Sequence, residues 1–194
     1  MESVETLKKL RSETGVSMSA CKKALDESGG DIEKAKEILR KSGQDLAGKK
    51  SSRETEQGII ESYIHANKKV GVLLDIRTET DFVAKSDDFR KIAHEICLQI
   101  AAVAPLYVKE EDISENLLKK EEEIYREQFK NSAKPKEVID NIVKGKIEKQ
   151  KKEISLLSQP WVKDNSKTIK DLIEEKIAKL GENIIVEKFV RYEI

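Results

Sequence analysis

The chain of 194 residues contains few of the residues that carry chemistry. It has two cysteines, two histidines and one tryptophan, and aromatic residues make up only 5% of the sequence. It also lacks any uninterrupted apolar run of about 18 residues or more, which excludes a membrane-spanning helix. The N-terminus has no apolar core of a secretion signal. We therefore expect a cytoplasmic protein with no membrane partner.

The scarce residues form no catalytic or metal-binding group. Cys21 and Cys97 lie far apart, without metal-ligand spacing, and fall on apolar helix faces, so we expect buried free thiols. His65 and His94 are isolated from any serine, cysteine or aspartate that could act with them. Gly29-Gly30-Asp31 lacks the spacing and the lysine of a phosphate loop. From these absences we expect that the protein is not an enzyme and that it binds no cofactor or metal.

Charge is abundant but balanced. The 37 acidic and 37 basic residues cancel, although 38% of all residues are charged. A neutral chain is poorly suited to a nucleic-acid backbone, and basic residues do not alternate with aromatic ones as in single-strand binders. The composition favours long solvated helices and a protein partner over direct nucleic-acid binding.

The most informative stretch is Glu79-Thr80-Asp81-Phe82-Val83-Ala84. It follows an apolar run that predicts a strand at 70–78 and precedes a long pattern of helical period. Thr80 can cap the next helical turn, and Asp81 suits the positive end of a helix. Phe82 is a large apolar side chain beside an acid at a turn. It either packs into the core or is presented as a wedge to a partner, and the residue types alone leave both alternatives open.

The N-terminal part predicts a small head of three helices at 1–43. The first helix begins near Ser3 and stops at Gly15, Ser17 caps the second, and Asp31 caps a third that ends at Gly43. Apolar residues at helical spacing predict the core of this head: Leu7, Leu10, Met18, Cys21, Leu25, Ile32, Ala35, Ile38 and Leu39. Three short helices give only a marginal core. The polar residues 44–56 are interpreted as a linker, with a helical start as an open alternative.

Residues 57–194 predict an α+β domain. Strands at 58–65 and 70–78 are joined by a turn in which Asn67 is expected to have a positive φ. A helix ending before Pro105 and a later helix beginning near Thr168 back the sheet, and 184–194 forms the third antiparallel strand. Between them, charged segments with narrow apolar seams predict an antiparallel coiled-coil hairpin at about 112–157, with Pro135 opening its second helix.

Five groups of residues occur in a fixed order along the chain. They are Leu10-Arg11 with Thr14-Gly15, Met18 and Cys21-Lys22-Lys23-Ala24-Leu25; Ile64-His65 with Val70-Gly71-Val72-Leu73; Thr80-Asp81-Phe82-Val83-Ala84; Lys134-Pro135; and Gln159-Pro160-Trp161 with Ser166-Lys167-Thr168 and Phe189-Val190-Arg191-Tyr192-Glu193. Together they resemble the signatures of the elongation factor Ts family. In that family the N-terminal head resembles a ubiquitin-associated bundle.

The resemblance implies a guanine-nucleotide exchange factor for elongation factor Tu. It places Thr80, Asp81, Phe82 and Val83 at the partner's Mg²⁺ and phosphate site, where the wedge promotes GDP release. It also assigns Leu10, Met18 and Lys22 of the head to the partner-binding surface. The hairpin would contact another domain of the partner.

Two other function classes and one assembly state are considered. A binding module or scaffold could be built on the head alone, and a ribosome- or RNA-associated protein is a third class. The signature turn together with the hairpin favours the exchange factor. Longer family members carry a second copy of the sheet unit, whereas this sequence has one, so the resemblance also implies a homodimer.

Overall fold

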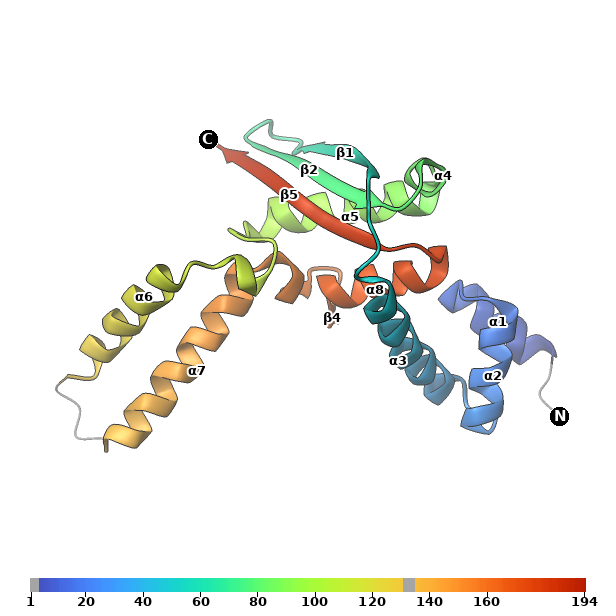
Figure 1. Ribbon diagram of the computed structural model, residues 1–194, viewed down its shortest axis with the longest axis horizontal. Coiled ribbons are helices and arrows are strands. Elements are labelled where there is room, and N and C mark those ends of the chain that lie inside the picture. Colours follow the sequence, from blue (N-terminus) through green and yellow to red (C-terminus); the bar gives the residue numbers. More distant parts are fainter. Residues whose placement is uncertain (1–3, 131–134) are drawn as a thin grey trace. The chain divides into compact units, whose positions relative to one another are not determined.

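The computed structural model describes residues 4–130 and 135–194 (Figure 1). The elements are α1 (Val4–Thr14), α2 (Met18–Ser28), α3 (Ile32–Lys50), β1 (Gln57–Ile64), β2 (Val70–Thr78), α4 (Asp81–Ala84), α5 (Asp87–Val103), η1 (Glu110–Asp112), α6 (Glu115–Gln128), α7 (Lys136–Ile154), η2 (Leu156–Ser158), β3 (Pro160–Trp161), β4 (Asp164–Thr168), α8 (Ile169–Leu180) and β5 (Ile184–Glu193). The predicted helix start at Ser3 and the motif residue Lys134 lie outside the described residues. The predicted α+β fold is confirmed.

The chain forms two compact units. Unit one contains the described residues of 1–61 together with 74–95 and 171–187, and unit two contains 62–73, 96–170 and 188–194. Within the described ranges, no helix combines the length and the apolar character that crossing a bilayer would require.

The main sheet has the strand order β1-β2-β5 (Figure 1). At the β1–β2 turn the amide of His65 donates to the carbonyl of Val70 at 2.9 Å. Positive φ falls on Lys68, at 61°, and not on Asn67 as predicted. The Asn67 side chain instead accepts from the amide of Lys69 at 2.9 Å. Asn67 thus stabilises the turn through its side chain, and the next residue takes the left-handed conformation.

Strand β2 is buried on one side only. Val72, Leu74, Ile76 and Thr78 are buried, whereas Leu73 is exposed. Because successive side chains point to opposite faces, this alternation fixes which face of the strand is covered. It also places Thr78 at the end of the buried row, directly before the signature stretch.

The head contains the three predicted helices, and its core is the predicted one except at Met18, which was predicted to be buried but is 38% exposed. Leu10, Cys21, Ala24, Leu25, Ala35 and Leu39 form a buried cluster. Ser17 caps α2 and Asp31 caps α3, each accepting from backbone amides of the following turn. Both cysteines are buried free thiols, as the sequence indicated.

Helix α3 does not end at Gly43, so the predicted end of this helix was wrong. It continues to Lys50 through residues assigned to a linker, and Gly43 is buried within it. A Cβ atom on Gly43 would lie 3.4 Å from the Cβ of Ala178 in α8. The glycine therefore allows close approach of two helices in unit one and does not terminate either of them. Gln44 extends the same contact, since its Nε2 donates to Asp171 at 3.1 Å.

In unit two, α6 and α7 form the predicted hairpin. Arg126 pairs with Asp140, and Lys146 donates to Gln128 at 2.8 Å and lies 4.9 Å from the centre of the Tyr125 ring. Polar contacts therefore join the two helices along a seam that contains few buried residues.

A small antiparallel pair, β3 and β4, was not predicted. Buried Gln99 of α5 fixes it, because its Nε2 donates to the Pro160 carbonyl at 3.1 Å and its Oε1 accepts from the Val162 amide at 2.9 Å. Such a pairing depends on a glutamine some sixty positions away in sequence. Local sequence patterns therefore could not predict this pairing.

Gly58 of β1 provides a test of the sheet in unit one. A Cβ atom at Gly58 would lie 2.3 Å from the carbonyl oxygen of Ile76 and 2.8 Å from the Cα of Arg77. We expect Gly58→Ala to lower the free energy of unfolding by about 1–3 kcal/mol, because the backbone of β2 must shift. Gly48→Ala, on helix α3 with no atom within 4 Å, should instead raise it by about 0.5–1 kcal/mol. Urea unfolding of both variants measures the difference. Equal effects would contradict the close approach.

Candidate protein-interaction site

The signature turn, defined as residues 79–84, connects β2 to α5. Thr80 has an extended backbone, with φ −125° and ψ 155°, and caps the four-residue helix α4. Its Oγ1 accepts from the amide of Val83 at 3.4 Å. Val83 and Ala84 are buried and anchor the turn to unit one. The predicted capping role of Thr80 is therefore observed.

Phe82 points away from this anchor. Its side chain is 82% exposed, the highest value for any aromatic residue among the described part of the chain. The alternative in which Phe82 packs into the core is thus excluded. Val83 is only 5% exposed, so it supports the turn and is not itself available to a partner in this conformation.

Glu182, in the connection from α8 to β5, binds the start of the turn. Its Oε2 accepts from the Thr78 hydroxyl and from the Thr80 amide, both at 3.0 Å. Its Oε1 accepts from the Thr80 hydroxyl at 2.7 Å. One carboxylate therefore satisfies the buried Thr78 hydroxyl and two donors of the capping residue.

Glu79 makes a contact in the opposite direction, from the signature turn to the connection between α8 and β5. Its Oε1 accepts from the backbone amide of Asn183 at 2.6 Å. Its Oε2 lies 3.3 Å from the Arg53 guanidinium. The backbone hydrogen bond from Asn183 is the main cause that lowers the pKa of Glu79 below its usual value, with Arg53 contributing. Glu79 is therefore ionised at neutral pH. We call Glu79 and Glu182 the acidic clamp.

The charge at the exposed end of the turn is also fixed. Asp81 accepts from Lys85 at 2.7 Å, one helical turn later. That hydrogen bond lowers the pKa of Asp81 below its usual value. Both side chains are exposed, so the pair contributes little to stability but flanks Phe82 with charge.

The three head residues assigned to a partner surface differ in exposure. Met18 and Lys22 are exposed on α2. Leu10 is 0% exposed and belongs to the head core, so it stabilises the helices and cannot contact a partner in this conformation. The assignment of Leu10 to a contact surface is therefore corrected.

Sequence reasoning missed Glu182, Asn183 and Arg53. These residues lie more than a hundred positions, or 26 in the case of Arg53, from the turn residues that they bind. No local spacing signals such partners. In the part of the chain that the structure describes, no three acidic, histidine or cysteine side chains gather as a metal site.

Comparison with known proteins agrees with the signature. The family model described as Elongation factor TS matches residues 5–194. The chain belongs to the elongation factor Ts family. A protein of Coprothermobacter proteolyticus named Elongation factor Ts is 54% identical over 190 residues, covering 98% of this chain and 96% of the relative. Those of Caldanaerobacter subterraneus and Thermosipho melanesiensis are each 49% identical and cover 100% of this chain, with 96% and 99% of the relative covered.

Family membership makes the chain a translation elongation factor and confirms the predicted resemblance. The contribution of the individual residues is not given by the family name. It rests on the geometry of the signature turn and of the head in this elongation factor Ts.

Two phenylalanines test the geometry. Phe82→Ala should change the free energy of unfolding by no more than about 0.5 kcal/mol, because the side chain is exposed. Phe89→Ala, a matched change at a fully buried position in α5, should cost about 3–5 kcal/mol. Denaturant unfolding of both variants measures the contrast. A large loss for Phe82→Ala would show that this side chain is packed in solution.

Proposed function

We propose that this protein is a guanine-nucleotide exchange factor that binds elongation factor Tu–GDP in the cytoplasm and promotes GDP release. The observation that carries the proposal is the exposed Phe82 on a turn fixed by the acidic clamp. A protein acting in this way needs no bond-making residues. It works by a difference in binding free energy between two states of its partner.

The proposed mechanism is thermodynamic linkage. Asp81 and Phe82 enter beside the nucleotide site and displace the groups that position Mg²⁺ and the phosphates. Exchange factor and nucleotide then weaken each other's binding by the same factor. Burial of a phenylalanine can contribute roughly 1.5–3 kcal/mol to this distortion. Because Phe82 is 82% exposed in the free protein, almost all of that burial remains available on binding.

A fixed turn makes this contribution effective. A flexible turn would lose conformational freedom on binding, and that loss would offset part of the burial. Here the cap of Thr80, the buried Val83 and the acidic clamp order the turn beforehand. Met18 and Lys22 of the head, and the hairpin of α6 and α7, would supply contacts that do not depend on the wedge.

A scaffold built on the head alone remains the competing proposal. It would use Met18 and Lys22 but would have no use for an exposed aromatic side chain on an ordered turn. Single exposed apolar residues are common on protein surfaces, so what favours the exchange factor is that the turn carrying Phe82 is held in one conformation by its cap and by the acidic clamp.

Release of a fluorescent GDP from elongation factor Tu tests the function. Catalytic amounts of this protein should accelerate release, and Phe82→Ala should lower the maximal rate roughly tenfold or more, as loss of its burial implies. The dissociation constant of the complex should change less, since the head and hairpin remain. Val162→Ala, at another exposed apolar residue, is the matched control and should exchange normally. No acceleration by the unaltered protein at saturating concentration would favour the scaffold.

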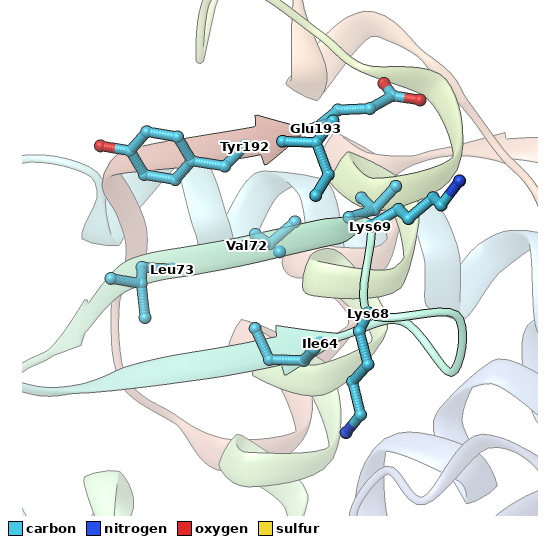
Figure 2. Close-up of a pocket in the computed structure, with 10 residues that line it drawn as sticks. Ile64, Lys68, Lys69, Val72, Leu73, Tyr192 and Glu193 are labelled. Carbon is cyan, nitrogen blue, oxygen red and sulfur yellow. The ribbon is translucent and has the colours of Figure 1, made fainter.

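We also propose that two copies associate through the open face of the sheet in unit two. Ile64, Leu73, Tyr192 and Ile194 are exposed there and line a depression of about 350 Å³ (Figure 2). Lys68, Lys69 and Glu193 lie at its rim. A two-fold interface places a patch against itself, so rim charges of both signs on one patch can pair between copies. A contiguous apolar surface with a charged rim fits a second copy of this chain.

Sedimentation at micromolar concentration tests this association. The unaltered protein should sediment as a dimer, and Leu73→Asp should sediment as a monomer because a charge would be buried in an apolar contact. Leu106→Asp is the matched control, since Leu106 is also a leucine and is even more exposed, at 67% against 49% for Leu73, but does not line the depression. It should remain dimeric. A monomeric mass for the unaltered protein would refute the proposal.

A further inference from the structure

The Glu182 side chain accepts three hydrogen bonds where β2 leads into the signature turn, two of them from Thr80 and one from Thr78, the residue directly before the turn. It accepts from the Thr78 hydroxyl, the Thr80 amide and the Thr80 hydroxyl, at 3.0, 3.0 and 2.7 Å. None of the sequence motifs includes Glu182. Its carboxylate contacts neither Asp81 nor Phe82, so any effect on them must pass through Thr80.

We propose that Glu182 is a positioning residue for nucleotide exchange. It fixes Thr80, and through Thr80 it orients Asp81 and Phe82 toward the partner. The inference rests on the proposed exchange function. The proposed function needs Phe82 to be exposed. This inference adds that a carboxylate outside the turn must also hold the turn in order.

The direction of each hydrogen bond follows from chemistry. The Glu182 oxygen accepts in this contact, so the Thr80 hydroxyl donates its single proton to Glu182. The oxygen lone pairs of Thr80 are then free to accept from the Val83 amide, at 3.4 Å. Glu182 thereby selects the hydroxyl orientation that caps α4. Without that selection, the capping bond is one of several orientations open to the hydroxyl.

The carboxylate is itself fixed by the backbone on both sides. Gly181, which ends α8 with φ +79°, accepts from Lys50 through its carbonyl. The Asn183 amide donates to Glu79 at 2.6 Å. Residues 181–183 are therefore bound to α3 on one side and to the signature turn on the other. The backbone that carries the Glu182 side chain is therefore held in place on both sides.

Helix α4 needs such support because it has only four residues. A single helical turn is unfavourable in isolation, since it fixes several backbone dihedrals for one hydrogen bond. When the cap is lost, only a fraction of molecules presents Phe82 in the competent orientation. Head and hairpin contacts still form, so the complex assembles, but the exchange rate falls in proportion to that fraction.

Glu182→Gln is the sharpest variant because it preserves shape. The amide keeps one accepting oxygen and replaces the other with a donor. With its oxygen toward Thr78 and the Thr80 amide, its NH₂ group faces the Thr80 hydroxyl and reverses that hydrogen bond. Glu187→Gln is the matched control, since Glu187 is an exposed glutamate of β5 in the same unit. Its exchange should equal that of the unaltered protein.

Two measurements decide the inference. For Glu182→Gln, the maximal rate of GDP release should fall roughly fivefold to tenfold, as expected for loss of a charge-assisted hydrogen bond. The concentration for half-maximal rate should change by less than about twofold, because head and hairpin contacts are unaltered. Amide hydrogen exchange of the free protein should become faster at Thr80 and Val83 and at the other amides bonded within α4, those of Ala84 and Lys85, and stay unchanged elsewhere. In a double-mutant cycle with Thr80→Val, the two effects should be less than additive, since both act through one hydroxyl.

Three results would overturn the inference. The first is that Glu182→Gln changes neither the kinetics of GDP release nor the amide protection of the turn. The second is that this variant raises the half-maximal concentration while the maximal rate of GDP release stays the same. The third is that the variant is destabilised throughout but releases GDP at the normal rate per folded molecule. If the unaltered protein fails to release GDP, the proposed function is wrong. Amide protection at Thr80 and Val83 then still decides whether Glu182 orders the turn, because that measurement needs no partner.

Discussion

The contact between the acidic clamp and the end of β2 is the constraint on which the signature turn depends. Glu182 binds Thr78 and Thr80, and Glu79 binds the Asn183 amide in return. The buried row of β2 determines where the strand ends, but it cannot direct the path of the chain beyond Thr78. Two carboxylates reaching in opposite directions join that end to the segment between α8 and β5. The hydrogen bond from the Asn183 backbone lowers the pKa of Glu79, and a hydrogen bond to a charged acceptor is stronger than a neutral one.

Exposure of Phe82 is compatible with folding only because its neighbours are anchored. Val83 and Ala84 are buried directly beside it, and the cap at Thr80 closes the helical turn. The exposed Asp81–Lys85 ion pair adds two charged side chains to the same short helical segment. The turn therefore separates two tasks between adjacent residues. Val83 and Ala84 stabilise the fold, whereas Asp81 and Phe82 remain available to a partner.

The sequence predicted the parts of this arrangement that local patterns encode. The bounds of β2, the capping role of Thr80 and the head core followed from periodicity and capping chemistry. The end of α3 was mispredicted because Gly43 has two explanations in a sequence, a helix stop or a close helix contact, and only its neighbour Ala178 distinguishes them. Glu182 was missed for a related reason. A glutamate after Gly181 resembles any solvated acid until its partners, over a hundred positions earlier, are known.

The proposed function sets a strict condition on which contacts matter for rate. A contact that binds the nucleotide-bound and nucleotide-free partner equally adds affinity for both and does not favour release. Contacts from the head and hairpin are of this kind if they touch surfaces that the nucleotide does not alter. In the proposed mechanism Phe82 differs, because its binding place would exist only when the nucleotide site is distorted. Residues that order Phe82, such as Glu182, should likewise affect the rate of GDP release, even though they do not touch the partner. Affinity and exchange rate should therefore separate at the signature turn and its clamp, and change together elsewhere.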